Sequence, residues 1–562
     1  MPLRNLRDFI TSSPNVFVTQ SIFGSMARRN RRLLRGETTY SAVKDEEVNI
    51  LHRLGYIEQQ DKFFTALSRK QSWMKAVVAH HLGLQSPDSC SIASQEDWIH
   101  GSFNVCIPVT VSSGWQGKAQ AGQRLMLRFP LPYRVGDIFR PGNSDEKLRC
   151  EAGTYAWFQQ NAADVPIPQL YGFALSTGET FTVLNCLPFW KRSFFKLRCF
   201  ALSCLGRRLP SSFLPHQYSY MAESGIMDAG YLLIEYIEES TGQMLSKAWR
   251  EKRGNGQLRT NFFRSLSRIL LSITRTKLPR IGSFLIDNGG YLQLGNRPLS
   301  VEIPDLENEQ IPTDIPRDYT YSAVESYVMD ILRFHDNRIL RQPNAVNDVV
   351  DYSSQVAALA IMRAALPSFS NPSLRRGPFV MTLTDFNQSN IIVDEHWNIA
   401  CLLDLEWICS QPIEMFQVPV WLTCQAVDEI ARKPEEYGRV RQGLVEILAE
   451  EEKLLSGSPL QEQDGQHRLS TIMEQGWANG TFWYSLALGS PTGLHAIFYK
   501  QIKPRFLKNC PKHDEFLNVV PWYWRPDFFE VGLQKIKDKS SYDKQLREAF
   551  EDAPEASNQK NT

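Results

Sequence analysis

The sequence predicts an α+β protein with two lobes, a small β-rich lobe followed by a larger, mainly helical one. Three observations support this class. Runs of β-branched residues begin after Trp98, apolar residues at helical spacing dominate from about residue 241, and a short strand–loop–strand segment lies within residues 379–408. Strands followed by helices are typical of α+β folds, and a cleft between two lobes is a common place for a small-ligand site.

The composition is that of an ordinary globular protein and argues against several functional classes. Of 562 residues, 43% are hydrophobic, and the net charge of +1 gives no reason to expect nucleic-acid binding. We find no apolar run of the 18 or so residues that a membrane span needs. The ten cysteines form no C-x-x-C pair, so we expect reduced thiols, no zinc site and a cytoplasmic protein. The oligomeric state is left open.

Residues 1–95 are expected to form a helical extension, because apolar residues recur at helical spacing between residues 46 and 84. The adjacent pair His80-His81 is interpreted as core or surface histidines rather than metal ligands, since neighbouring helix positions point in different directions. The arginine cluster at residues 28–32 allows two interpretations, the solvated end of a helix or part of a mitochondrial targeting segment.

The β-rich lobe is expected to span residues 96–237. Segments 103–111 and 124–129 should pair as a hairpin with a long polar turn, a helix should follow over 147–161, and 231–237 should be a buried strand. These elements place a sheet and one helix ahead of the helical lobe.

A basic, aromatic insertion at residues 182–225 interrupts this lobe, with Trp190-Lys191-Arg192 and Phe194-Phe195-Lys196 as its densest part. It could pack on the host lobe, or it could be an amphipathic helix that binds a membrane surface or a partner. Residues 238–545 should form the helical lobe, and the polar residues 546–562 a disordered tail.

The most informative segment lies in the helical lobe. Asp385 and Asn390 share one loop ahead of the apolar strand 391–393, and a turn leads to the return strand 399–403, directly before Asp404. Such a hairpin brings Asp404 back beside Asn390. Carboxylate and carboxamide oxygens suit Mg²⁺, and Asp385 is free to accept a proton from a hydroxyl, which is the set that phosphoryl transfer needs. The plainer interpretation is a β-hairpin with polar loop ends.

With its text T-D-F-N-Q-S-N-I-I-V-D followed by L-D-L-E-W, this segment resembles the catalytic region of aminoglycoside phosphotransferase and choline kinase-like enzymes, in particular a fungal branch of that family. The resemblance covers residues 98 to about 539. It implies a bilobal protein-kinase-like fold and the transfer of the γ-phosphate of ATP, with Mg²⁺, to a hydroxyl of a small molecule. It implies Asp385 as the catalytic base and Asn390 and Asp404 as the metal ligands.

The resemblance also implies nucleotide-binding positions in the β-rich lobe. Gly101-Ser102-Phe103-Asn104 would be the loop over the phosphates. Arg128 would stand where the family has a lysine, with Glu151 as its helical partner. The backbone from Glu235 to Ile237 would hold the adenine.

Four positions depart from the family pattern: Leu383 and Asn387 replace histidines, Arg128 replaces lysine, and Gly101 is a single glycine. The alternative prediction is therefore a weak or inactive kinase-like nucleotide-binding or scaffold protein. The substrate is not specified. An acidic pocket formed by Glu406, Asp428 and Glu429 would favour an amine, unless the last two form a solvated helix face.

Overall fold

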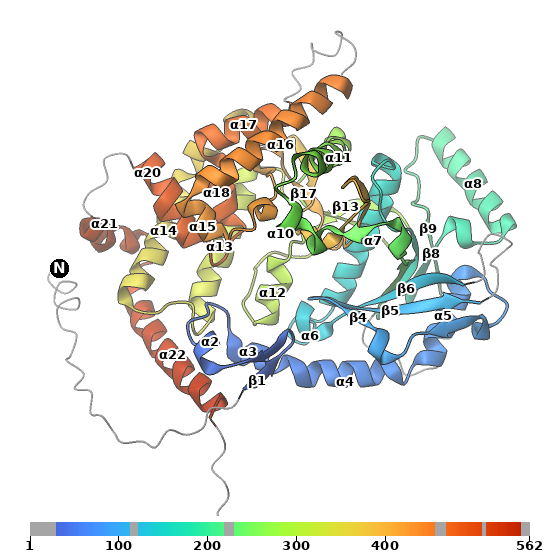
Figure 1. Cartoon of the computed structure of the whole chain (residues 1–562), viewed down its shortest axis with the longest axis horizontal. Helices are drawn as coiled ribbons and strands as arrows, with labels where there is room; N and C mark the ends of the chain where they lie inside the picture. Colours follow the sequence, from blue (N-terminus) through green and yellow to red (C-terminus); the bar gives the residue numbers. More distant parts are fainter. Residues whose placement is uncertain (1–29, 113–121, 218–229, 456–467, 508–512, 552–562) are drawn as a thin grey trace, which may run out of the picture. The chain divides into compact units, whose positions relative to one another are not determined.

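Strands concentrate in the N-terminal part of the chain and helices in the C-terminal part, as Figure 1 shows, so the α+β class is confirmed. The computed structural model describes residues 30–112, 122–217, 230–455, 468–507 and 513–551. Two compact units are formed: a terminal unit of residues 1–59, 335–364 and 507–562, and a central unit of residues 60–334 and 365–506. The sequence from 1 to 95, expected as one extension, thus contributes to both units.

An antiparallel sheet organises the first half of the central unit. Its strands follow the spatial order β3-β5-β6-β10-β7-β8-β9, with β4 also paired to β5. Their bounds are β3 Cys90–Ile92, β4 Ile99–His100, β5 Asn104–Val111, β6 Gln123–Pro130, β7 Leu170–Ala174, β8 Glu179–Val183, β9 Phe213–Gln217 and β10 Tyr231–Glu235. The predicted hairpin is β5–β6, and the predicted buried strand, β10, lies between β6 and β7.

Helices α5 (Gln71–Leu82) and α7 (Asn143–Asn161) cover opposite faces of this sheet. Successive side chains of a strand point to opposite faces. On β6, Phe129 therefore packs against Trp73 of α5, with ring centroids 6.2 Å apart, while Arg128 reaches Glu151 of α7. The alternation along one strand places a cation on the face of the sheet that α7 covers.

Helix α5 places a buried histidine against the sheet. His81 is fully buried and its ring nitrogens lie 2.8 Å from Thr182 Oγ1 and 2.9 Å from Tyr231 OH. A Cβ on Gly172 would lie 2.3 Å from His81 Nδ1, so only glycine fits there. His216 Nε2 lies 2.8 Å from the same Thr182 hydroxyl. His81 is therefore a core residue.

Acidification is expected to destabilise the central unit through these histidines. Burial, and then the neighbouring His80 and Lys191, lower the pKa of His216 to about 4. Because the unfolded chain takes up a proton near pH 6.5 and the folded chain only near pH 4, stability should fall as the pH drops through that window. His216→Gln, which retains a polar group toward Thr182, should lessen the fall in melting temperature between pH 7 and pH 4. An unchanged pH profile would contradict this.

A buried ion cluster joins α7 to α12 (Glu302–Asn308). Arg297, 1% exposed, donates to Glu146 Oε1 and Oε2 at 2.8 Å each, and to Glu307 Oε1 at 2.8 Å and Oε2 at 3.0 Å. Thr313 and the carbonyl of Ile315 accept further hydrogen bonds from Arg297 Nη1. Each carboxylate oxygen facing Arg297 thus has a donor.

Helices dominate the rest of the central unit. They are α6 Pro132–Val135, α8 Phe189–Cys204, α10 Trp249–Lys252, α11 Gly256–Arg275, α15 Val427–Arg432, α16 Pro434–Leu455, α17 Leu469–Asn479, α18 Thr481–Leu488, α19 Leu494–Ile497 and α20 Lys503–Phe506. Small antiparallel ladders lie among them: β11 (Gln243–Met244) with β15 (Ile391–Val393) and β16 (Ile399–Leu402), β12 (Ser283–Ile286) with β13 (Leu292–Asn296), and β14 (Phe379–Thr382) with β17 (Cys409–Pro412). Helices α4 (Tyr56–Ser68), α13 (Val324–Arg341) and α14 (Val349–Phe369) each contain residues of both units.

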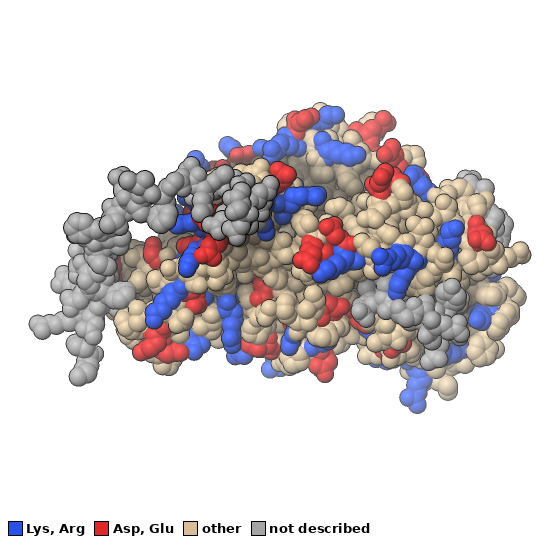
Figure 2. Space-filling model, turned by 90° about the horizontal axis from the view of Figure 1, so that it is seen from below, with Lys and Arg blue, Asp and Glu red and all other residues tan. Residues whose placement is uncertain are grey.

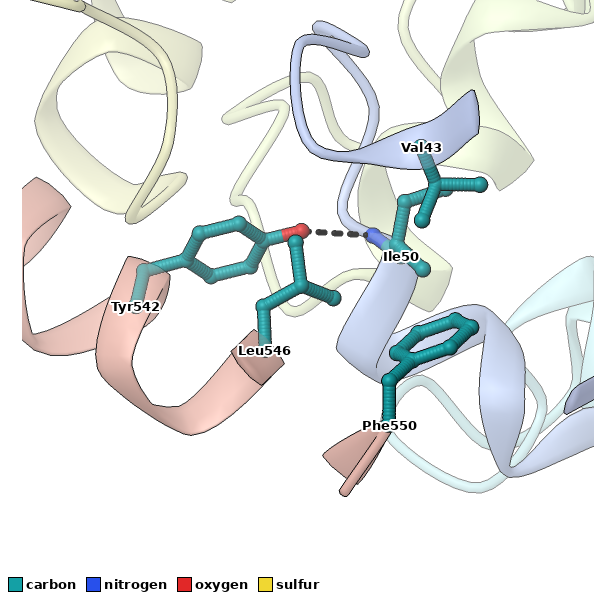
Figure 3. Close-up of a cluster of buried hydrophobic side chains, with 5 residues drawn as sticks. All are labelled: Val43, Ile50, Tyr542, Leu546 and Phe550. Carbon is teal, nitrogen blue, oxygen red and sulfur yellow. Dashed lines mark hydrogen bonds between the residues drawn. The ribbon is translucent and has the colours of Figure 1, made fainter. Parts of the chain in front are cut away.

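The terminal unit brings the two ends of the described chain together. It contains β1 Arg31–Leu33, β2 Gly36–Thr38, α2 Tyr40–Val43, α3 Ile50–Leu54, α21 His513–Val519 and α22 Phe528–Ala549. Figure 3 shows Val43 and Ile50 packed with Tyr542, Leu546 and Phe550, and the Ile50 N–H donates to Tyr542 OH at 2.9 Å.

Two expectations for the terminal regions need correction. Arg31 and Arg32 lie in β1, not at a helix end, and residues 1–29, which carry the suggested targeting segment, lie outside the described residues. Helix α22 continues to Ala549, so the start of the expected disordered tail is helical, because Leu546 and Phe550 are buried. Residues 552–562 lie outside the described residues.

Leu546→Ala should destabilise the terminal unit by about 2–5 kcal/mol, because it removes a side chain that is 1% exposed and leaves a cavity. Lys544→Ala on the same helix is the matched control, since that side chain is 80% exposed. Chemical denaturation monitored by circular dichroism measures both. Equal effects of the two substitutions would be inconsistent with the packing in Figure 3.

Surface charge follows the balanced composition. Figure 2 shows basic and acidic side chains interspersed over the coloured atoms of one face. In the part of the chain that the structure describes, no helix is long and apolar enough to cross a membrane.

Candidate active site

Two loops face each other in the central unit, because the strands that precede them and the strands that follow them are paired. β14 pairs with β17, up to Thr382 opposite Cys409, and β15 pairs with β16. The second pairing continues into a hydrogen bond from the Leu403 N–H to the Asn390 carbonyl, 2.8 Å. Residues 383–390 and 403–408 are the loops enclosed by these ladders. The predicted return hairpin is therefore present.

These loops line a common hollow that is partly open to solvent. Asp385 and Asn390 come from the first loop and Asp404 from the second, with Leu383, Phe386 and Trp407 among the apolar walls. The three polar side chains singled out from the sequence thus line one pocket.

Direct contacts fix the first loop. Asn387 Oδ1 accepts the Ser389 N–H at 3.1 Å and caps the 3-10 turn Gln388–Asn390. Thr384 Oγ1 donates to the Trp407 carbonyl, and Trp421 Nε1 donates to the Phe386 carbonyl at 2.6 Å. The loop is therefore held in place although Leu383 and Asn387 stand where the resembling family has histidines.

Asp404 has left-handed backbone geometry, with φ of 60°. Aspartate tolerates this region better than most residues, and non-glycine residues held there cluster at functional sites. This geometry follows directly on the end of β16 and turns the chain toward Trp407.

A buried ion network lies against Asp404. Arg128 donates to Glu151, to Asp404 Oδ1 and, at 2.9 Å, to Glu406 Oε2. Arg128, Glu151 and Glu406 are almost inaccessible to solvent. The strand β6, the helix α7 and the loop after β16 thus meet through one guanidinium, whose planar fork can serve several carboxylates at once. The pairing of Arg128 with Glu151 is the one that the sequence resemblance implied.

Two further residues belong to this network: Lys147, which the sequence reasoning missed as a site residue, and Asn104, which the resemblance placed only in the loop over the phosphates. Lys147 Nζ lies 2.5 Å from Glu406 Oε2 and 3.6 Å from Glu151 Oε2, and it donates to Asn104 Oδ1 at 2.6 Å. Asn104 Nδ2 donates to the same Glu406 oxygen at 2.6 Å. The available signal was the spacing of Lys147 and Glu151, four residues apart on one predicted helix, which places both on one face.

Negative charge is in excess around the pocket. In formal charge, the carboxylates exceed the cations by two: Glu151, Asp385, Asp404 and Glu406 against Arg128 and Lys147. Burial, then the carboxylates of Asp404 and Glu406, raise the pKa of Asp385 to about 7. Burial also raises the pKa of Glu151 to about 7, against the opposing effect of Arg128. A carboxyl group that titrates near neutral pH is matched to proton transfer.

Two of the polar side chains that line the pocket carry oxygen donors of the kind that Mg²⁺ prefers. Asn390 supplies a carboxamide oxygen and Asp404 a carboxylate of which Oδ1 accepts from Arg128. Among the described residues, no group of three or more His, Cys, Asp and Glu side chains could hold a metal. Mg²⁺ typically binds through one or two carboxylates, waters and substrate phosphates rather than in an all-protein cage. The charge excess of two would be offset by such an ion.

The segment Gly101-Ser102-Phe103 is the turn between β4 and β5. The Gly101 N–H donates to the Asn104 carbonyl at 2.9 Å, and a Cβ at Gly101 would meet nothing within 4 Å. Phe103 turns inward and packs on Trp407, with ring centroids 5.1 Å apart. The turn therefore lies beside the Asp404 loop, although its glycine is not required by sterics.

The backbone from Glu235 to Ile237, which the resemblance implied would hold the adenine, begins at the end of β10. The Glu235 N–H donates to the Gln169 carbonyl at 2.8 Å, and a Glu235 carboxylate oxygen accepts the Gln169 N–H at 3.0 Å. The backbone N–H of Glu235 therefore already has an acceptor. The Glu235 carbonyl and the backbone of Ile237 remain as candidates for hydrogen bonds to an adenine.

The structure does not favour an acidic substrate pocket formed by Glu406, Asp428 and Glu429. Asp428 on α15 forms an i,i+4 ion pair with Arg432 at 2.9 Å, and Glu429 is exposed. Glu406 is buried against Lys147 and Arg128. The solvated-face interpretation of Asp428 and Glu429 is therefore favoured.

A scan of the chain against models of known protein families finds no match, and a search of curated proteins finds no relative.

Proposed function

We propose that the central unit is a kinase-like phosphotransferase that moves the γ-phosphate of ATP, with Mg²⁺, to a hydroxyl of a small molecule. The observation that carries this proposal is the convergence of Asp385, Asn390 and Asp404 on one pocket. The resemblance of the same residues to the catalytic segment of aminoglycoside phosphotransferase and choline kinase-like enzymes supports it.

Each of these residues has a distinct role in the proposal. Asp385 accepts the proton of the substrate hydroxyl and orients its oxygen, a task for which a pKa near 7 is suited. Asn390 and Asp404 hold the metal, which neutralises charge on the phosphates when it is bound. Arg128, which contacts Glu151 and Asp404, would interact with the phosphates, and Lys147 offsets the charge of Glu406.

The first experiment measures MgATP binding to the full chain by isothermal titration calorimetry and by thermal shift. Binding that requires Mg²⁺ supports the proposal, and transfer of labelled γ-phosphate to a library of hydroxyl-bearing metabolites would then identify the substrate class. Absence of nucleotide binding in the presence of Mg²⁺ would exclude the proposal.

A second candidate function is a kinase-like nucleotide-binding protein without turnover. The observation that favours it is the contact of Arg128 with Asp404 Oδ1, which occupies one oxygen of a proposed metal ligand. This candidate predicts nucleotide binding that does not change on adding Mg²⁺ or on substituting Asp404→Asn. The transferase proposal predicts that both changes alter binding strongly.

A further inference from the structure

Helix α8 (Phe189–Cys204) exposes large apolar side chains to an unusual extent. Isolated apolar residues on a surface are ordinary, but contiguous ones indicate an interaction site. The exposed fractions are Phe189 75%, Trp190 66%, Phe194 69%, Leu197 65% and Phe200 68%, with Leu205 73% directly after the helix. Figure 1 shows α8 at the outer edge of the sheet, beside β8 and β9.

These side chains share one face of the helix. With about 100° of rotation per residue, the five exposed residues of α8 cover an arc of about 140°. Phe195, Cys199 and Arg192, which are buried or partly buried, lie about 180° from the centre of that arc. The helix therefore packs on the protein with a narrow strip and turns its apolar face outward.

Basic residues border the apolar face on both sides. On the same rotation of about 100° per residue, Lys196 lies at one edge of the arc, and Lys191 and Arg198 at the other. Residues 180–222 contain six basic side chains and no Asp or Glu, in a chain whose net charge is +1.

The basic groups of this region keep their charge uncompensated. Arg198 donates to Tyr291 OH at 3.2 Å and Arg208 to the Leu292 carbonyl at 3.1 Å, both neutral acceptors. Within the described residues, none of the six forms an ion pair with a carboxylate. Positive charge therefore surrounds the exposed apolar side chains.

We propose that α8 is a docking surface for an anionic lipid bilayer. An amphipathic helix with Trp, Phe and Leu on one face and Lys and Arg at its borders lies in the interface plane of a membrane, where the apolar groups enter the acyl boundary and the cations reach the headgroups. Apolar insertion and basic charge act together, as stable peripheral binding requires.

The charges favour a bilayer over a second copy of this chain. Two copies meeting through the apolar faces would bring the bordering Lys191 and Lys196 of each against like charges of the other, which is repulsive. An anionic bilayer instead offers complementary charge to both borders at once. The apolar face also belongs to a single helix at the edge of the sheet, where a flat bilayer surface can reach it.

The test is co-sedimentation of the full chain with vesicles of phosphatidylcholine alone or mixed with phosphatidylserine, at low and high salt. We expect binding to the mixed vesicles that weakens with salt. Trp190→Ser with Phe194→Ser, and separately Lys191→Glu with Lys196→Glu, should each weaken it at least about tenfold. Ile138→Ser, at a side chain 62% exposed elsewhere in the central unit, and Lys453→Glu on α16 should leave binding unchanged.

Four results would overturn the proposal. The first is absence of binding to the mixed vesicles. The second is equal binding by the wild type and both double variants, and the third is equal binding to neutral and anionic vesicles. The fourth is a dimer in solution that Trp190→Ser with Phe194→Ser converts to a monomer, which would assign the face to a second copy. Unchanged melting temperatures would show that the variants fold, as expected for exposed side chains.

Discussion

Replacing Arg297 by Met should destabilise the central unit by about 3–5 kcal/mol, because a buried ion cluster would lose its cation. Arg297 is 1% exposed and donates to all four carboxylate oxygens of Glu146 and Glu307. Without the guanidinium, the remaining cations are Arg317 beside Glu146 and Arg140, 3.6 Å from Glu307 Oε1, and both are partly exposed to solvent. Thr313 and Asn143 still donate to Glu307, but these donors are neutral.

Arg317→Met is the matched control, since Arg317 donates to the same Glu146, 3.0 Å away, from a side chain 42% exposed. Exposed ion pairs contribute about 0–1 kcal/mol, so a small change is expected. Equilibrium denaturation measures both variants. Adding Glu307→Gln to Arg297→Met should recover part of the loss, because it removes one of the two buried carboxylates that Arg297 neutralised. Equal losses of unfolding free energy in the two arginine variants would contradict the prediction that burial of Arg297 makes its ion pairs the more stabilising ones.

The parts of the candidate site that could be predicted from sequence are those fixed by short-range pairing. The return hairpin depends on two apolar strands and a turn within residues 391–403, so the placement of Asn390 near Asp404 follows from local pattern alone. The roles proposed for these residues rest on the resemblance and stay predictions.

The ion network around Arg128 could not be predicted in full because it depends on how three elements pack. Lys147 and Asn104 reach Glu406, some 260 and 300 residues away in sequence, only once α7 has covered one face of the sheet. Periodicity indicates which face of a helix is buried. It does not indicate which buried polar groups of distant segments will meet.

In the terminal unit, too, sequence patterns could not predict which residues meet, and these residues lie even farther apart in the chain. The hydrogen bond between Ile50 and Tyr542 joins residues 492 apart in the chain. Composition near residue 546 is polar, and the two buried side chains there, Leu546 and Phe550, acquire their partners only from the other end of the chain. A disorder prediction based on local composition therefore started too early.

The proposed function predicts that Asp385→Asn lowers phosphoryl transfer by about 10²–10⁴-fold while leaving MgATP affinity nearly unchanged. Asparagine has almost the same shape as aspartate but cannot accept the proton of a hydroxyl. The proposed metal ligands, Asn390 and Asp404, are untouched by the substitution. Asp394→Asn is the control in the same segment. Asp394 is a partly exposed turn residue whose Oδ1 accepts the N–H groups of His396 and Asn398, and an asparagine oxygen can do the same.

Stability provides the check that distinguishes lost chemistry from lost folding. The pKa of Asp385 is raised to about 7 in the folded protein, first by burial and then by Asp404 and Glu406. The stability that its protonated form contributes is present below about pH 4 and is lost as the pH rises through 7. Asparagine, which never ionises, avoids this loss. Without divalent cations, Asp385→Asn should therefore melt at or above the wild-type temperature at pH 8, with the difference shrinking toward pH 4. A variant that lost activity and also melted lower at pH 8 would place Asp385 in the fold rather than in proton transfer.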